Sequence, residues 1–175
     1  MRIVIDGRFY GLENAGLGRY TLNLVQELAR QDYKNEYLLL LRKKYFNRLK
    51  LPTNWTQILA DFPHYGLQEQ IALPRLIFSL KPDLVHFLHF NVPIFYHGPY
   101  VVTIHDLLMH RQKGFAATTL PAANYLVKRL GYKAVFARAI KKAKKVIVPS
   151  NAVKKELLNY YQIKPEKVVV TYEGI

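Results

Sequence analysis

The sequence predicts an α/β protein with a parallel sheet covered by helices on both faces. Short apolar runs of the kind that form buried strands alternate with segments whose apolar residues recur every three or four positions. This alternation is typical of parallel strands joined by helices. With 175 residues the chain can build a real core, and we expect a single domain over residues 1–175.

The first strand is expected at Ile3 to Ile5, the first apolar run of the chain. Further strands are expected at residues 36–41, 55–60, 84–90, 100–104, 145–148 and 167–171. Helical spacing predicts helices near residues 17–29, 68–80, 120–144 and 151–161. We expect Pro74 to kink or restart the second helix, Gly131 to interrupt the third, and Ser150 to cap the fourth.

Charge is the unusual property of this sequence. It carries 26 Lys and Arg against 12 Asp and Glu, which gives a formal net charge of +14. Twelve of the basic residues lie between Asp106 and Glu156, where there is no acidic residue. Such a field favours an anionic partner: nucleic acid, acidic lipid headgroups or a phosphorylated substrate. Cations that complement the end of a helix are the structural alternative.

The composition argues against several classes of protein. There is no cysteine, so neither disulfides nor a thiolate metal site can form. No apolar run approaches the roughly 20 residues of a membrane-spanning helix. The first strand begins within two residues of the N-terminus, which leaves no room for a signal peptide. We therefore expect a cytoplasmic protein.

Several chemically versatile residues follow expected strands. The segment Gly16-Leu17-Gly18 follows the first strand, His105-Asp106 follows the fifth, and Ser150 follows the sixth. Because ligands bind at the carboxyl ends of parallel strands, we expect these residues to share one edge of the sheet. His89 and Asn91 are expected on one face of the fourth strand near its end, where they would line a pocket.

The glycine segment is a candidate phosphate site. A strand, a glycine loop and a helix place backbone N–H groups and the positive helix end against a phosphate. A loop that only turns the chain is the equal alternative. The segment lacks the third glycine of a dinucleotide fingerprint. Arg42-Lys43-Lys44 follows the second strand in place of the acidic residue that grips the ribose of NAD.

The histidines allow more than one role. His86 and His89 point to opposite faces of a strand, so they do not share a metal ion, and no metal or cofactor is expected. At the end of a strand, His105 can act as an acid or base, donate to a sugar or phosphate, or satisfy a loop carbonyl. On charge alone, a basic α/β module that binds nucleic acid is the main alternative, although no recognition signature supports it.

Six motifs occur in order along the chain: Gly16-Leu17-Gly18-Arg19-Tyr20, Gln68-Glu69-Gln70 with Leu73-Pro74, Pro82-Asp83-Leu84-Val85-His86, Val102-Thr103-Ile104-His105-Asp106-Leu107, Val146-Ile147-Val148-Pro149-Ser150, and Pro165-Glu166-Lys167-Val168-Val169-Val170 ending in Tyr172-Glu173-Gly174-Ile175. Together they resemble the N-terminal half of glycosyltransferase family 4, retaining enzymes of the GT-B fold, especially their mannosyltransferase-like branch. The resemblance covers essentially the whole chain. It implies a Rossmann-like sheet that forms half of a GT-B enzyme.

The resemblance also implies roles for individual residues. The backbone of Gly16, Leu17 and Gly18 would approach the donor diphosphate. His105 would orient hydroxyls of the donor sugar at the catalytic centre, and Asp106 would hold its loop. Arg19, Tyr20, His89 and Asn91 would face the acceptor. The expected substrates are a nucleotide-sugar donor and a glycan or lipid-linked acceptor, with no metal and no protein nucleophile.

Because the resemblance is to the N-terminal half of the family, we expect the second, nucleotide-sugar-binding domain to be absent from these 175 residues. We therefore expect this acceptor-side domain to be inactive alone, as an excised domain or a half-enzyme. A non-catalytic half-transferase that acts as a partner subunit is a further alternative. The basic charge suggests a lipid-phosphate acceptor and a peripheral contact with the anionic inner face of the membrane. No nucleic-acid partner is expected on this interpretation.

Overall fold

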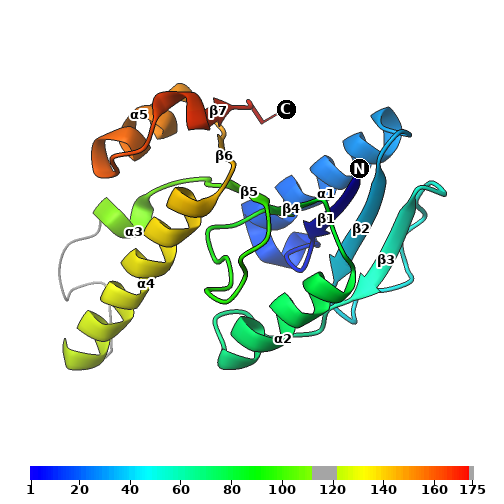
Figure 1. The fold of residues 1–175 in the computed structure, drawn as a ribbon, viewed down its shortest axis with the longest axis horizontal. Coiled ribbons are helices and arrows are strands. Elements are labelled where there is room, and N and C mark those ends of the chain that lie inside the picture. The colour runs from blue at the N-terminus through cyan, green and yellow to red at the C-terminus, as the bar shows by residue number, and fades with distance from the viewer. Residues whose placement is uncertain (112–121, 174–175) are drawn as a thin grey trace. The chain divides into compact units, whose positions relative to one another are not determined.

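The computed structural model describes residues 1–111 and 122–173, and its elements are labelled in Figure 1. Seven strands form one sheet in the order β3-β2-β1-β4-β5-β6-β7. Every strand pair whose register is defined is parallel. The parallel α/β fold predicted from the sequence is confirmed.

The elements follow the predicted alternation of strands and helices. The strands are β1 (Arg2–Asp6), β2 (Glu36–Leu41), β3 (Trp55–Leu59), β4 (Leu84–Phe87), β5 (Tyr100–Thr103), β6 (Lys145–Val148) and β7 (Val168–Val170). The helices are α1 (Ala15–Gln31), α2 (Leu67–Ser79), α3 (Leu108–Arg111), α4 (Ala122–Lys142) and α5 (Asn151–Tyr160), with short 3₁₀ turns η1 (Leu12–Asn14) and η3 (Pro165–Lys167).

The chain divides into two compact units. The first contains residues 1–88 and 93–101, and the second contains residues 89–92 and 102–175. Strands β1 to β4 and helices α1 and α2 belong to the first unit. Strands β6 and β7 and helices α3 to α5 belong to the second, and the boundary between the units runs within β5.

In the first unit a hydrophobic core lies between α1 and one face of the sheet. Ile5 of β1 and Leu39 of β2 are paired in register and almost completely buried. They belong to the same hydrophobic cluster as Val25 and Ala29 of α1. These apolar side chains lie on one side of the helix because they are four residues apart, which is slightly more than one helical turn.

Helix α2 covers the opposite face of this sheet (Figure 1). Side chains alternate along a strand, so Asp6 of β1 points away from the side of Ile5 that meets α1. Asp6 shares an ion network with Glu69 of α2, through a residue of the loop that follows β1. Leu73 and Ile77 of α2 are fully buried, one helical turn apart. Both faces of the sheet in the first unit are therefore covered.

In the second unit, α5 packs against the parallel pair β6–β7. Val146 of β6 lies opposite Val168 of β7, and both are buried together with Leu157 of α5. The end of α4 adds the buried side chains of Phe136 and Ile140. Ser150 caps α5 as predicted, because its Oγ accepts a hydrogen bond of 3.2 Å from the backbone N–H of Val153.

Two local predictions are wrong, and part of a third is wrong. β4 ends at Phe87 and does not continue to residue 90, so strand alternation does not apply to the residues that follow. α4 continues through Gly131 without an interruption. α2 does not restart at Pro74, while the kink expected there stays a prediction. Gly131 has open space around its Cα, which indicates that no close packing interrupts the helix there. Pro74 is buried within α2, so packing of this helix offsets the local breaker signal.

His110 of α3 lies in an aromatic cluster of the second unit. Its ring centroid is 4.7 Å from that of Phe136 and 5.2 Å from that of Tyr132. Its two ring nitrogens are hydrogen-bonded to the hydroxyls of Tyr132 and Tyr161. Burial lowers the pKa of His110. The positive charges of Lys133 and Arg129 lower it further, against the opposing effect of Glu156.

A lowered pKa makes the stability of the second unit depend on pH. Just below the unfolded value of about 6.5, the unfolded chain binds more protons at His110 than the folded protein does. The free energy of unfolding is therefore highest above that pH. It falls as the pH is lowered, by at most about 1.4 kcal/mol per pH unit. We expect His110→Gln to be less stable than wild type at about pH 7.5. On acidification to about pH 5, its melting temperature should fall by less than that of the wild type.

Thermal unfolding followed by circular dichroism at the two pH values tests this prediction. His97→Gln supplies the control, because it removes an exposed histidine and leaves His110 in place. An unchanged acid-induced loss in His110→Gln would contradict the prediction.

Candidate functional site

The first unit contains the point at which the strand order reverses. After β1 the chain builds β2 and β3 on one side, and then returns to place β4 on the other side of β1. Ligands of open α/β sheets bind beyond the carboxyl ends of the strands at such a point. Here β1 ends at Asp6 and β4 ends at Phe87.

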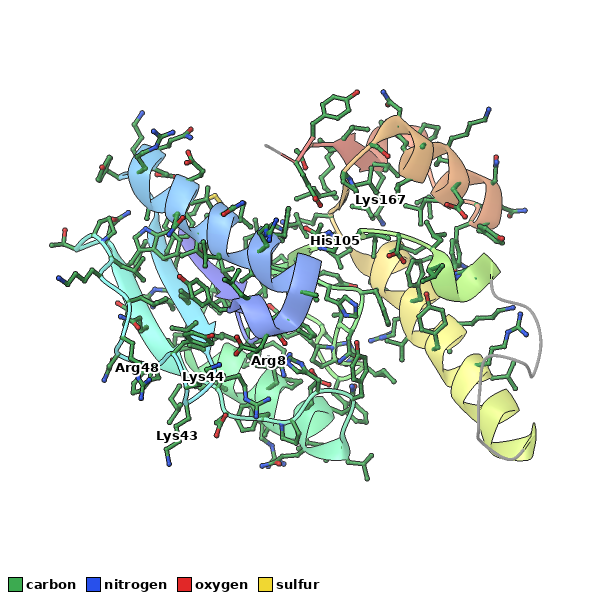
Figure 2. All side chains as sticks on the ribbon, turned by 180° about the vertical axis from the view of Figure 1, so that it is seen from behind. Arg8, Lys43, Lys44, Arg48, His105 and Lys167 are labelled. Carbon is green, nitrogen blue, oxygen red and sulfur yellow. The ribbon has the colours of Figure 1, made fainter. Side chains whose placement is uncertain are left out.

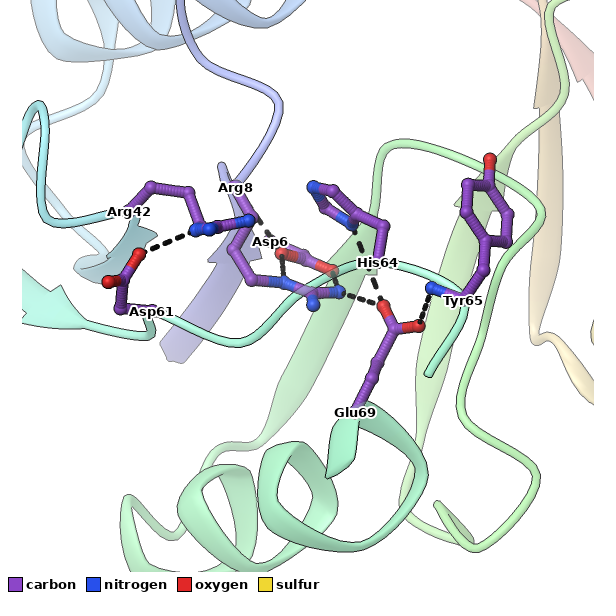
Figure 3. A network of polar contacts seen from close by, with 7 residues as sticks. All are labelled: Asp6, Arg8, Arg42, Asp61, His64, Tyr65 and Glu69. Carbon is purple, nitrogen blue, oxygen red and sulfur yellow. Dashed lines mark hydrogen bonds and ion pairs between the residues drawn. The ribbon is translucent and has the colours of Figure 1, made fainter. Parts of the chain in front are cut away.

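A buried ion network occupies the carboxyl end of β1 (Figure 3). The guanidinium of Arg8 donates two hydrogen bonds of 2.7 Å to the two carboxylate oxygens of Asp6. Its Nη2 also lies 2.8 Å from Oε1 of Glu69 on α2. Arg8, Asp6 and Glu69 are 2%, 5% and 0% exposed. The network therefore joins β1, the following loop and α2 in an interior where unpaired charges are costly.

Electrostatics keep Arg8 charged. Burial alone opposes the positive charge of the guanidinium, but attraction and hydrogen bonds to Asp6 and then Glu69 outweigh it and raise the pKa of Arg8 above its ordinary value. His64 approaches the same network, since its Nδ1 lies 3.7 Å from Oε1 of Glu69, and its ring stacks on Phe9. The backbone N–H of Tyr65 donates to the other Glu69 oxygen at 2.8 Å.

The N-terminus of α1 has the properties of an anion site. The preceding residue Asn14 does not cap the helix with its side chain, and the first turn contains no acidic residue. The first N–H groups of a helix have no acceptor within the helix, and the helix dipole favours an anion beside them. Gly16 is exposed in this turn. The predicted glycine loop thus lies inside the first turn of α1, which begins at Ala15.

The turn before α1 is held in place by a second segment. Oε1 of Glu13 lies 2.9 Å from Nζ of Lys44, and Oε2 of Glu13 accepts a hydrogen bond of 2.7 Å from the Tyr45 hydroxyl. The hydrogen bond from Lys44 has the largest effect and that from Tyr45 the next largest, and they lower the pKa of Glu13 to about 2. The carboxylate is therefore ionised at neutral pH, and it ties η1 to the turn after β2 (Lys43, Lys44 and Arg48 are labelled in Figure 2).

Gly18 and Gly16 have different structural roles. A Cβ atom on Gly18 would come within 1.9 Å of the carbonyl oxygen of Gly11, so Gly18 lets α1 approach the preceding turn. A Cβ on Gly16 would meet nothing within 4 Å. The other predicted residues of this segment lie nearby: Leu17 is half-buried, Arg19 is exposed, and Tyr20 packs partly against the core of the first unit.

The second unit contains the remaining predicted site residues. Nδ1 of His105 lies 3.2 Å from Oε1 of Glu173, and 22% of the His105 side chain is exposed. Oδ1 of Asp106 accepts a hydrogen bond of 3.0 Å from the backbone N–H of Leu108, at the start of α3. Ser150 caps α5, so its hydroxyl has a structural role.

His89 and Asn91 also belong to the second unit. They lie beyond the end of β4, so the prediction that they share a face of that strand is wrong. Asn91 is buried, and the ring of His89 lies 4.0 Å from that of Phe90. The glycines of α1 and His105 belong to different units, and their convergence on one site stays a prediction.

Sequence reasoning missed Arg8, His64 and Glu69 as members of one network. Two signals pointed toward it: charged residues directly after the first apolar strand, and the carboxylate within Gln68-Glu69-Gln70. Among the described residues, no group of three or more His, Asp or Glu side chains is placed to hold a metal ion. In the same part of the chain, no helix is both long and apolar enough to cross a membrane.

The sheet order and its reversal beside β1 define a Rossmann-like α/β protein with a ligand edge at the carboxyl ends of its strands. The model of Glycosyltransferase Family 4 matches residues 14–175, and the chain belongs to this family. This membership favours the glycosyltransferase interpretation over the nucleic-acid-binding module.

A crystal structure of a glycosyltransferase from Rickettsia africae ESF-5 is similar, with a TM-score of 0.55 and 16% sequence identity. The match covers 99% of this chain and 43% of that chain, so this chain spans less than half the length of its structural neighbour. At this identity the likeness shows the shared fold. A search of curated proteins found no match.

The ion network predicts an unequal response to loss of its members. Arg8→Ala leaves two buried carboxylates without their cation and should lower the free energy of unfolding by about 3–5 kcal/mol. Glu69→Gln removes the surplus negative charge and keeps an acceptor oxygen, so its cost should be on the order of 1 kcal/mol. Urea denaturation of both variants measures the difference.

The exposed pair of Arg30 and Glu27 on α1 supplies a matched control for that experiment. Arg30→Ala removes a similar contact from solvent and should change stability by less than about 1 kcal/mol. Equal effects of Arg8→Ala and Arg30→Ala would show that the buried network does not stabilise the first unit.

The two glycines of α1 predict opposite effects of a methyl group. Gly18→Ala drives the new Cβ into the Gly11 carbonyl and should lower the free energy of unfolding by about 1–3 kcal/mol. Gly16→Ala meets open space and should be neutral or stabilise by up to about 1 kcal/mol, because alanine is the better helix former. Melting temperatures of the two variants provide the test, and the reverse order would contradict it.

Proposed function

We propose that this chain is the acceptor-side domain of a retaining glycosyltransferase that moves a sugar from a nucleotide-sugar donor to a glycan or lipid-linked acceptor. The family match over residues 14–175 carries the proposal. The greater length of the structural neighbour supports a second, nucleotide-binding domain in the active enzyme. In this proposal the 175-residue chain alone transfers no sugar.

The donor diphosphate is assigned to the N-terminus of α1, at the backbone of Gly16, Leu17 and Gly18. The uncapped first turn, its lack of acidic residues and the exposure of Gly16 support this assignment. Backbone N–H groups at a helix N-terminus bind phosphate through hydrogen bonds and the helix dipole. Since Gly18 is fixed by packing against Gly11, Gly16 is the glycine at which a ligand can approach the backbone.

His105 is assigned to the donor sugar, where its imidazole would orient a hydroxyl and stabilise the reacting centre. The nearby Glu173 carboxylate supports this role, because a hydrogen-bond partner at Nδ1 holds the orientation of the ring. Asp106 would hold the loop by capping α3. The leaving phosphate would assist attack on the same face of the sugar, so no protein nucleophile is assigned.

The acceptor would contact Arg19, Tyr20, His89 and Asn91, and mannose is the proposed sugar. The net charge of +14 supports an acceptor that carries a phosphate, in a polysaccharide pathway with lipid-linked intermediates. It also supports a peripheral contact with the anionic inner face of the membrane.

Substitution of His105 tests the proposed chemistry. In the enzyme that contains both domains, His105→Ala should lower the rate of sugar transfer by about 100-fold or more, because a positioned hydrogen-bonding and acid–base group is lost. The melting temperature should change little, since the side chain is partly exposed. The assay is sugar transfer from UDP- and GDP-linked donors to phospholipid-linked acceptors.

The exposed His97 gives the matched control, and His97→Ala should retain wild-type transfer. Full activity of His105→Ala would remove the assignment of this residue. Sugar transfer by the 175-residue chain alone would refute the proposed need for a second domain.

A further inference from the structure

A basic pocket lies in the second unit, where α4 ends and β6 and β7 begin. Its volume is about 430 Å³, within the usual range of roughly 300–1,000 Å³ for ligand sites. Its charged lining residues are Lys141, Lys144, Lys145, Lys164, Glu166 and Lys167. Ser150 follows the carboxyl end of β6, whereas this pocket lies at the amino end of the same strand. Within the second unit, the pocket therefore lies at the opposite end of β6 from Ser150.

Hydrogen bonds to backbone carbonyls fix two of the ammonium groups. Nζ of Lys167 donates to the carbonyl oxygen of Lys141 at the end of α4, at 2.6 Å (Lys167 is labelled in Figure 2). Nζ of Lys145 donates to the carbonyl oxygen of Glu166 at 2.8 Å. A lysine ammonium has three N–H donors, so each of the two retains donors for a ligand. The pocket therefore has two ammonium groups held by hydrogen bonds, beside the exposed side chains of Lys141, Lys144 and Lys164.

The partial negative charge at the C-terminus of α4 balances only part of the positive charge of these lysines. A helix C-terminus is equivalent to roughly half a negative elementary charge, and two lysines already bond to carbonyls at the pocket. Five lysines line the pocket with one glutamate. In the described part of the chain, no ion pair joins any of these lysines to a carboxylate.

Burial affects one ammonium group of the pocket. Burial lowers the pKa of Lys167, so its charged form is disfavoured in the folded protein relative to water. A bound anion would offset this cost through attraction and charge-assisted hydrogen bonds. Phosphate suits the arrangement because it carries up to two negative charges and several strong acceptor oxygens.

We propose that this lysine pocket binds a phosphate group, either of a soluble phosphorylated molecule or of a lipid headgroup. Lys145 and Lys167 would supply the ammonium groups held by hydrogen bonds, and the exposed Lys144 and Lys164 would supply ammonium groups from the two sides of the pocket. The site would hold this anion independently of the sugar-transfer reaction.

Calorimetric titration of the protein with inorganic pyrophosphate at about 50 mM salt tests the proposal, since low salt preserves electrostatic binding. We expect saturable binding that becomes about tenfold weaker or more in Lys144→Gln/Lys164→Gln. Both side chains are exposed, so the variant should keep the wild-type melting temperature.

A second surface pocket supplies the matched control. It has a similar volume of about 450 Å³, and its lining includes Lys34 and Lys81 together with Glu36 and Asp83. Lys34→Gln/Lys81→Gln removes the same charge and should leave pyrophosphate affinity within about twofold of wild type. The proposal is overturned by absence of saturable binding, by unchanged affinity in Lys144→Gln/Lys164→Gln, or by equal losses in the two double variants.

Vesicle co-sedimentation distinguishes the two sources of phosphate. Weaker binding of Lys144→Gln/Lys164→Gln to phosphatidic acid vesicles, with no change on phosphatidylcholine vesicles, supports a lipid headgroup. Wild-type vesicle binding together with the loss of pyrophosphate affinity supports a soluble ligand. Both results are independent of the His105 assay, so failure of the pocket and failure of the proposed transferase function can be told apart.

Discussion

The burial of Arg8 between two carboxylates is the constraint on which the first unit depends. Asp6 ends β1, Arg8 belongs to the loop after it, and Glu69 lies on α2. An unpaired charge in this interior would cost several kcal/mol, so the strand end, the loop and the helix must keep their relative positions. The network lies beside the reversal of strand order, and it therefore gives the ligand edge of the sheet a rigid support.

Close backbone packing extends this support to α1. Gly7 follows β1 and lies close to β2. A Cβ atom on Gly7 would come within 2.9 Å of the carbonyl oxygen of Leu40. Gly11 has a φ of 116°, in the region that favours glycine, and its carbonyl meets Gly18. The N-terminus of α1 is thus placed by contacts that only glycine permits. Gly16, which takes no part in this packing, remains exposed on the helix.

Local patterns in the sequence predicted the strands, most helices and the Ser150 cap because these features depend on neighbouring residues. Neither Pro74 nor Gly131 ends its helix, since α2 and α4 continue through them. The end of β4 was also misplaced, because the apolar pattern continues beyond the paired residues. The charges of Arg8 and Glu69 are visible in the sequence, but their pairing is not, since it joins segments far apart in the sequence and leaves no periodic trace.

The charge of the protein is concentrated in one unit, which bears on what each unit can bind. The first unit contains 12 basic and 8 acidic residues, whereas the second contains 14 basic and 4 acidic residues. In the first unit several cations pair with carboxylates, as in Arg42 with Asp61 and Lys44 with Glu13.

The positive surplus of the second unit has fewer carboxylates to balance it, and five of its lysines gather around one pocket. Coulombic steering by such a surplus acts over about a Debye length, which is roughly 8 Å at physiological salt. Lysines spread over a surface would attract anions without binding them at one place. Ammonium groups held by backbone carbonyls can instead bind an anion in a defined position and geometry. The placement of the lysines, more than the net charge of +14, is therefore the physical argument for a defined phosphate site in this unit.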